Sequence, residues 1–212
     1  MATPQAIIDF NPTLNSLCPK WTPLKIKGLL VHWLRQHFAT QANLSEPGIT
    51  DRVWTDADET EIIIETSGRW KPQTTEKRPA LIIHRGSLKP VRQGIANDRL
   101  MGAGAQAVHR QLHSTLFTMD LTVWCLAIAE GEVESLSTEV YKEVHKFAIK
   151  FVEKLGVIRV QLLEIGPLAR LEEAREHFGV PVSISFTFWE SWELDTRDTA
   201  ILDRITLTTT LT

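Results

Sequence analysis

Cysteine, tyrosine and long hydrophobic runs are scarce in this chain of 212 residues. It contains two cysteines, Cys18 and Cys125, and a single tyrosine. Two cysteines in a chain of this length do not make a disulfide framework, so we expect folding in a reducing compartment. Cys125 lies in the most hydrophobic stretch, which predicts a buried, reduced thiol.

Targeting and membrane-spanning signals are also lacking. The first residues do not show a basic segment followed by a hydrophobic core, which argues against a signal peptide. No hydrophobic run approaches the roughly 18 residues that a membrane span needs. We therefore expect a soluble protein, made in a cytoplasm, with no membrane partner. The formal net charge of −3 argues against a chain that binds nucleic acid as a polycation.

Hydrophobic residues and tryptophan are plentiful by contrast. Hydrophobic residues make up 43% and charged residues 23%, the balance of an ordinary globular protein. The seven tryptophans suit a core and also suit subunit interfaces. The pattern predicts an N-terminal arm (1–21), one α+β domain (22–195) and a Thr-rich tail (196–212) that could add an edge strand.

Hydrophobic periodicity predicts the elements of that domain. Helices are expected at 23–39, 130–155 and, shorter, 167–178; strands at 61–66, 80–84, 114–129, 157–165 and 182–189. A long loop is expected at 86–107, because glycines and a proline recur there without periodicity. This order predicts an α+β fold: a mixed or antiparallel sheet of about four or five strands, helices mainly on one face, and extended terminal arms.

Motifs for catalysis, cofactors or metals are weak. His109 and His113 would lie roughly 13 Å apart on a strand, and no cysteine or carboxylate completes a metal site. The five-residue spacing of His32 and His37 on a helix favours ordinary core or surface histidines. The glycines at 102 and 104 lack the lysine of a phosphate loop, and no nucleophile-elbow motif occurs. We predict no catalytic, cofactor-binding or metal-binding residues.

An acidic turn leaves one enzymatic alternative open. The carboxylates of Asp56, Asp58, Glu59 and Glu61 could bind Mg²⁺, as a metal-dependent nucleic-acid-processing enzyme requires. The lysine expected beyond a neighbouring strand is not found. The sequence therefore favours a solvated acidic turn, with the enzyme as the alternative.

Charge is distributed in two neighbouring blocks of opposite sign. Residues 51–65 contain six acidic residues and one arginine, whereas 67–99 contain eight basic and two acidic residues. The basic block runs into the expected loop, which could contact an acidic patch on an adjacent copy, or DNA phosphates. The candidate interface residues are therefore Arg85, Lys89, Arg92 and Arg99 on the basic side, and Asp56, Asp58 and Glu59 opposite.

The layout of residues 22–195 resembles a group of phage proteins. The resemblance rests on the strand Leu116-Phe117-Thr118-Met119-Asp120-Leu121-Thr122-Val123-Trp124-Cys125, the helix after Glu130-Gly131-Glu132, and the strand Phe186-Thr187-Phe188-Trp189. The resemblance rests on the order of the elements and their pattern of hydrophobic residues. It does not extend to the N-terminal arm or the C-terminal tail. The group is the tail terminator and tail-completion (neck) proteins of tailed bacteriophages.

This resemblance implies a structural role without catalysis. It implies an α+β subunit in a homohexameric ring at the head-proximal end of the tail, which ends growth of the tail tube and joins tail to neck. Tail tube and neck or connector proteins would be the partners, duplex DNA would pass through the lumen, and the mature location would be the virion. Another head–tail connector protein, or a non-viral oligomeric scaffold, is the remaining alternative.

Overall fold

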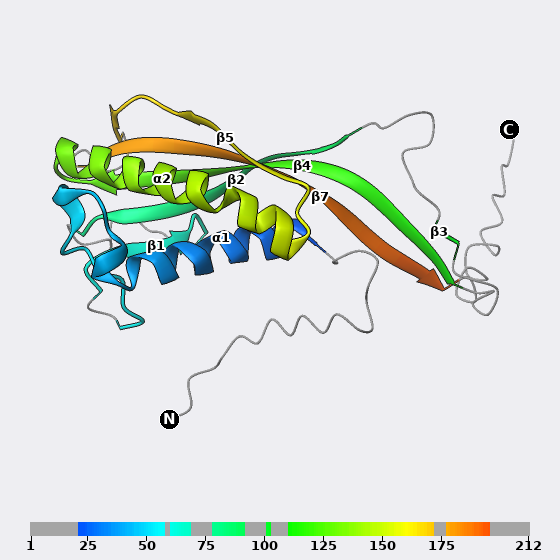
Figure 1. Ribbon diagram of the computed structural model, residues 1–212. Helices are drawn as coiled ribbons and strands as arrows, with labels where there is room; N and C mark the ends of the chain where they lie inside the picture. Colours follow the sequence, from blue (N-terminus) through cyan, green and yellow to red (C-terminus); the bar gives the residue numbers. More distant parts are fainter. Residues whose placement is uncertain are drawn as a thin grey trace, which may run out of the picture.

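The computed structural model describes residues 21–57, 60–68, 78–91, 101–102, 110–171 and 177–195, with backbone alone at 101–102, 110–114, 154 and 191–195. Two α-helices pack on a mixed β-sheet in this part of the chain (Figure 1). The predicted α+β class is therefore confirmed. None of the described helices is long and hydrophobic enough to cross a membrane.

Helix α1 (Pro23–Phe38) begins where its capping residues predict. Thr22 accepts a hydrogen bond from the backbone N–H of Lys25 (3.3 Å), and Pro23 occupies the first turn. One face of the helix is buried, with Ile26, Leu30 and Leu34 almost inaccessible to solvent. Two short 3₁₀ helices follow, η1 (Gln41–Asn43) and η2 (Pro47–Ile49).

Helix α2 (Glu130–Leu155) also has the predicted bounds. Glu130 and Glu132 lie in its first turn, where negative charge complements the helix dipole. Gly156 ends the helix in the left-handed conformation, with a φ angle of 65°. Its buried stripe includes Val133, Leu136, Val140 and Val144.

The sheet has five strands along its main path, in the order β1-β2-β4-β7-β5. β1 and β2 pair in parallel, and the other neighbours are antiparallel. Two further strands of two residues each lie off this path: β3 pairs with β4, and β6 pairs with β7. The bounds are β1 (Ile63–Thr66), β2 (Ala80–Pro90), β3 (Met101–Gly102), β4 (Arg110–Ala127), β5 (Arg159–Ile165), β6 (Ala169–Arg170) and β7 (Phe178–Asp195).

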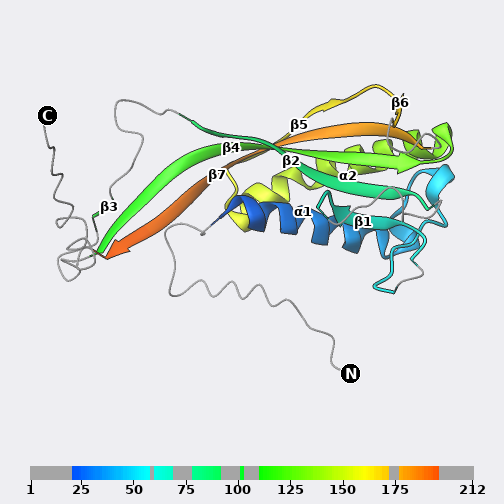
Figure 2. The same ribbon diagram turned by 180° about the vertical axis from the view of Figure 1, so that it is seen from behind.

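Both helices cover the same face of the sheet, as expected (Figure 2). α1 packs against β1 and β2, and α2 packs against β4, β5 and β7. Alternate residues of β4, such as Met119, Leu121 and Val123, point into this core. The other face has a small cluster of Ala80, Ile82 and Leu126.

The predicted loop at 86–107 begins too early. β2 continues to Pro90, past an irregularity in its pairing with β4 between Arg85 and Leu88. Gly86 lies at this irregularity, where an added Cβ would come within 3.3 Å of the Asp120 carbonyl oxygen. The glycine therefore permits a close approach inside a strand rather than starting a loop. Met101 and Gly102 form β3, and residues 92–100 and 103–107 lie outside the described residues.

The predicted short helix at 167–178 is wrong. Ala169 and Arg170 form β6, and Phe178 is the first residue of β7, while 172–176 lie outside the described residues. β7 is also longer than predicted and reaches Asp195. The expected tail at 196–212 and the arm, apart from Trp21, lie outside the described part of the chain. Trp21 is buried, and its indole donates a hydrogen bond to the Leu155 carbonyl (2.8 Å).

Candidate assembly surface

The basic candidates that the structure describes lie on a strand, not in a loop. Arg85 and Lys89 are exposed residues in the second half of β2. Burial, and then the charge of nearby Arg85, lower the pKa of Lys27 on α1. This end of β2 therefore carries positive charge beside α1. Arg92 and Arg99 lie outside the described residues.

The acidic candidates lie toward the other end of the same strand. Asp56 is exposed in the segment between η2 and β1, whereas Asp58 and Glu59 lie outside the described residues. The backbone N–H of Ile63, at the start of β1, bonds the carbonyl of Pro79, just before β2. Arg85 is five residues past Ala80, or about 17 Å further along the strand. One copy of the chain thus does not bring Asp56 and Arg85 together, and contact between copies stays a prediction.

A two-stranded ribbon extends from the sheet beyond its flanking strands. β4 and β7 pair over their whole length, from Arg110–Asp195 to Ala127–Phe178. The pairing of β2 with β4 ends at Phe117, and that of β5 with β7 ends at Thr187. The remaining residues, 110–116 and 189–195, form what we call the ribbon, about 24 Å long. It curves away from both helices (Figure 1).

The ribbon has an unpaired backbone edge. β3 pairs with Gln111 and Leu112 on the β4 side. On the β7 side, residues 189–195 have no partner strand among the described residues. Isolated two-stranded ribbons are marginal in water, and a free edge is a template for pairing with another chain. The ribbon is therefore the part of this fold most in need of another surface.

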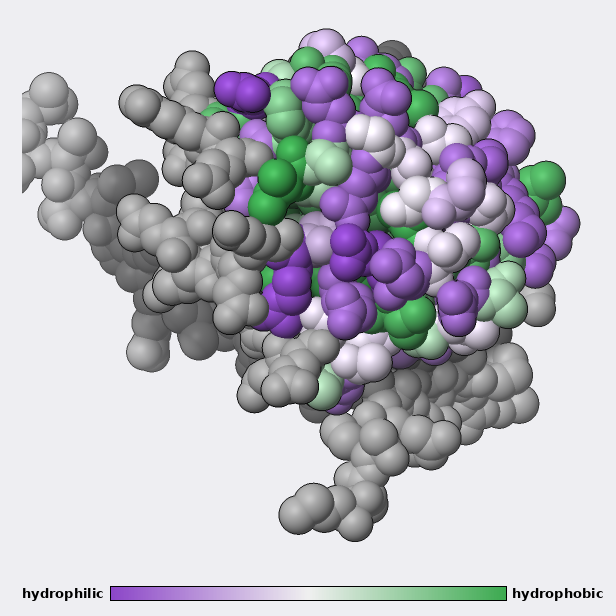
Figure 3. All heavy atoms as spheres, turned by 90° about the vertical axis from the view of Figure 1, so that its left-hand side faces the viewer, coloured by the Kyte–Doolittle hydropathy of each residue, from purple (hydrophilic) through white to green (hydrophobic). Residues whose placement is uncertain are grey.

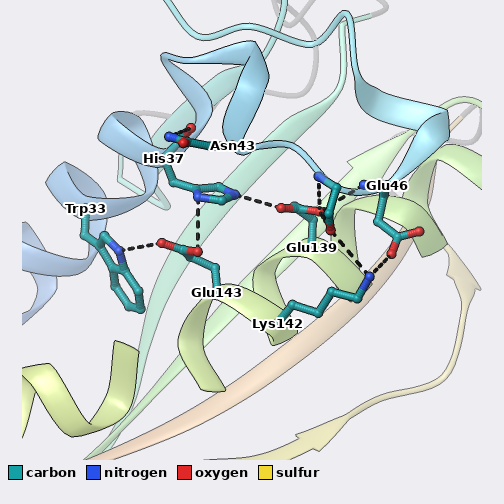
Figure 4. Close-up of polar contacts among 8 residues, drawn as sticks. Trp33, His37, Asn43, Glu46, Glu139, Lys142 and Glu143 are labelled. Carbon is teal, nitrogen blue, oxygen red and sulfur yellow. Dashed lines mark hydrogen bonds and ion pairs between the residues drawn. The ribbon is translucent and has the colours of Figure 1, made fainter. Parts of the chain in front are cut away.

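A buried ionic cluster joins the two helices. His37 of α1 lies between two glutamates of α2, with Nε2 2.8 Å from Glu139 Oε1 and Nδ1 3.1 Å from Glu143 Oε2 (Figure 4). The indole of Trp33 donates to Glu143 (3.1 Å). The Ser45 hydroxyl and the backbone N–H groups of Ser45 and Glu46 donate to Glu139 Oε2. All three ionisable side chains of the cluster are at most 5% exposed.

The cluster favours a protonated histidine and ionised glutamates. Burial lowers the pKa of His37, but hydrogen bonds and charge from Glu143 and Glu139 outweigh it, so the pKa is raised. Burial raises the pKa of Glu139, but hydrogen bonds from Ser45 and His37 and the histidine charge lower it overall. Both imidazole nitrogens face carboxylates, and only the protonated ring donates from both. Because each carboxylate oxygen already has a donor, we interpret the cluster as a structural lock rather than a ligand site.

Sequence reasoning missed this cluster, although one signal was present. His37 follows Leu34 on the hydrophobic stripe of α1; the sequence analysis left core and surface positions open, and the structure buries it. In the sequence, Glu139 and Glu143 lie beside a row of lysines on α2, and this pattern does not distinguish a buried carboxylate from an exposed one. Their burial depends on how α1 crosses α2, which the pattern of neither helix contains.

The described residues offer little for the enzymatic alternative. No group of three or more His, Cys, Asp or Glu side chains in the described ranges is placed to hold a metal ion. Glu61 lies 3.5 Å from Arg52, which also pairs with Glu132 at 2.7 Å. His109 is not among the described residues, and only the backbone of His113 is described. No known family model matches this chain, and no curated protein matches it either.

Proposed function

We propose that this chain is a self-assembling structural subunit, which forms a ring that terminates a phage tail at its head-proximal end. The observation that carries the proposal is the ribbon of β4 and β7, whose β7 edge has no strand partner among the described residues. A strand edge of this kind gains backbone hydrogen bonds when it packs on another chain. The ribbon lies away from both helices, so neither helix covers it (Figure 1).

A ring requires that the ribbon of one copy contacts a different surface on the next copy. Because the ribbon lies at one end of the sheet, the rest of the body can provide such a surface. Such head-to-tail contacts generate a closed ring when the rotation between copies closes. The homohexamer, the tail tube and neck partners, and the passage of duplex DNA through the lumen come from the resemblance to tail terminators. The same resemblance supports a location in the virion after synthesis in the host cytoplasm.

The composition of the ribbon supports an interface. Its β7 half contains Trp189, Trp192 and Leu194, residue types that suit the buried centre of an interface. No described feature favours the nucleic-acid-processing alternative, whose residue Glu61 is paired with Arg52. A connector elsewhere in the neck would use the same kind of ribbon contact, so it remains the alternative within the structural class.

The test is the mass and shape of the full chain in solution. We expect mass photometry and negative-stain micrographs to show closed rings with a channel wide enough for duplex DNA. The variant Leu112→Ser/Trp192→Ser/Leu194→Ser, which removes hydrophobic groups from the ribbon, should yield monomers. Leu24→Ser, at an exposed position on α1, is the matched control and should keep the ring.

Circular dichroism and urea unfolding of each variant separate lost assembly from lost folding. A wild-type chain that stays monomeric even at near-millimolar concentration would overturn the proposal. So would a folded ribbon variant that assembles as tightly as the wild type.

A further inference from the structure

The exposed hydrophobic side chains of the described residues are not scattered evenly. Eight large ones are exposed, and six of these lie on α2, on β5 or in the turn between them. The end of the body that faces away from the ribbon is, by contrast, a mixture of hydrophilic and hydrophobic groups (Figure 3). The six, which we call the α2–β5 margin, are Tyr141, Ile149, Val152, Ile158, Leu163 and Ile165.

The α2 part of the margin is one side of the helix. Tyr141, Ile149 and Val152 are eight and three residues apart, which keeps them within about 80° on the helical wheel. The ring of His145 stacks on Tyr141 at 6.0 Å. This side is distinct from the buried stripe that includes Val140 and Val144, so the core does not use it.

The β5 part of the margin is an edge of the sheet. β5 pairs with β7 alone, which leaves its other backbone edge without a strand partner in the described residues. The pairing slips between Leu162 and Glu164, and the extra residue, Leu163, is 50% exposed. Edge strands are commonly protected by charged residues, proline or a bulge. β5 (Arg159–Ile165) has the bulge at Leu163 and two charged residues, but no lysine or proline.

We propose that the α2–β5 margin is the acceptor for the ribbon of a second copy of this chain. This inference rests on the proposed function and specifies its contact. The unpaired β7 edge of one copy would lie along the unpaired β5 edge of the next, so that the sheet continues from copy to copy.

Within one copy, β5 does not reach the ribbon. β5 reaches its last pairing at Arg159–Thr187, and the N–H of Ile158 already bonds the Thr187 carbonyl (2.9 Å). Its own chain turns there toward α2 through Gly156, so it does not extend along residues 189–195. Only another copy can bring a β5 edge to the ribbon.

Charge favours the same pairing. Residues 189–195 of the ribbon contain Glu190, Glu193 and Asp195 and no lysine or arginine. Residues 141–165, which span the margin, contain five basic and three acidic residues. One of those acids, Glu143, is buried against His37 and does not face a neighbour. An acidic ribbon therefore meets a surface of net positive charge, which favours this contact over ribbon against ribbon.

Crosslinking between single-cysteine subunits tests the contact directly. In a Cys18→Ser background we would place one cysteine in the ribbon (Ser191→Cys) and one on β5 (Glu164→Cys). Burial raises the pKa of the Cys125 thiol, so the native cysteine should not react. A bis-maleimide should link subunits when the two variants are mixed, and neither variant alone should form dimers.

The outcomes are distinct. Dimers from Glu164→Cys alone would indicate a contact between two β5 edges and overturn the proposal, as would rings in which the mixture forms no dimers. A wild-type chain that forms no ring removes the proposed function itself, and with it this inference.

A substitution in the margin gives an independent readout. Leu163→Glu should raise the protein concentration needed for ring formation at least tenfold, because it places an acidic residue against the acidic ribbon. Leu24→Glu, the same change at an exposed position on α1, should assemble as the wild type does. Unfolded variants are recognised by circular dichroism. Rings of unchanged stability in folded Leu163→Glu would contradict the assignment of the acceptor.

Discussion

Single residues decide how the two helices are held together, and His37 is the clearest case. It is the only cation between Glu139 and Glu143 in the described residues, and all three side chains are buried. Removing one partner of a buried ionic group leaves charge uncompensated, which costs far more than the net stabilisation by the intact group. We interpret the cluster as a device that fixes which faces of α1 and α2 meet, rather than as a large source of net stability.

The first prediction concerns that histidine. His37→Ala should lower the free energy of unfolding by about 3–5 kcal/mol, because two buried carboxylates lose the cation between them. His32→Ala is the matched control, since His32 is exposed on the same helix, and it should change stability by no more than about 0.5 kcal/mol. Urea unfolding measures both. Equal effects of the two substitutions would show that the cluster does not stabilise the fold.

The second prediction is a dependence of stability on pH. The raised pKa of His37 stabilises the fold below its ordinary value, and this contribution is lost as the pH rises through the raised value. The lowered pKa of Glu139 contributes above the ordinary carboxyl value and is lost as the pH falls through the lowered one.

Stability from the cluster should therefore be greatest between about pH 4.5 and about pH 6.5, and should decline toward alkaline pH. His37→Gln should flatten the alkaline side of this profile. An unchanged profile in a folded His37→Gln protein would contradict the assignment.

At the scale of the element, single residues set where helices and strands end, and Gly156 at the end of α2 is the clearest example. It ends α2 with a positive φ, which costs a residue with a Cβ about 1–2 kcal/mol. Gly156→Ala should destabilise the protein by about that amount. Gly28→Ala is the contrasting change, because Gly28 is exposed inside α1 and an added Cβ meets nothing within 4 Å. It should stabilise by roughly 0.5–1 kcal/mol. The opposite signs in urea unfolding form the test.

Both helices could be predicted from the sequence because their caps and stripes are local signals. Thr22, Pro23 and Gly156 set the ends, and periodicity sets the buried faces. The course of β2 could not be read in the same way. Gly86 and Pro90 resemble the residues of a loop, yet pairing with β4 holds them in a strand. Residues 167–178 were misread because Pro167 and Gly179 resemble helix boundaries, while long-range pairing with β4 places Phe178 in a strand.

The candidate site also combines features that the sequence shows with features that only the fold shows. The charge blocks are visible in the sequence, and Arg85 and Lys89 are indeed exposed. The ribbon is not visible there, because it exists only where β2 and β5 stop while β4 and β7 continue. Those end points depend on three registers at once, and no single segment contains them.

At the scale of the whole molecule, the separation of charge gives a further prediction. Arg85→Glu/Lys89→Glu reverses the exposed basic end of β2, so it should weaken assembly or DNA association at low salt. Mass photometry and a filter-binding assay with duplex DNA measure the two. Repeating both at about 1 M salt is the control, because screening then shortens electrostatic range to about 3 Å. If neither property changes, contact of this basic end with an acidic neighbour or with DNA is excluded.

The position of β7 in the sheet has a consequence for biosynthesis. β7 is the last described strand of the chain, yet it lies between β4 and β5. Until its residues leave the ribosome, β5 has no strand to join, and one long side of β4 stays bare. The nascent chain therefore leaves one side of β4 unpaired until β7 emerges, and the described part of the sheet is complete only after residue 195 has emerged. A prematurely stopped chain would lack an interior strand of the sheet rather than an edge strand. We therefore expect it to be a target for chaperones and proteases.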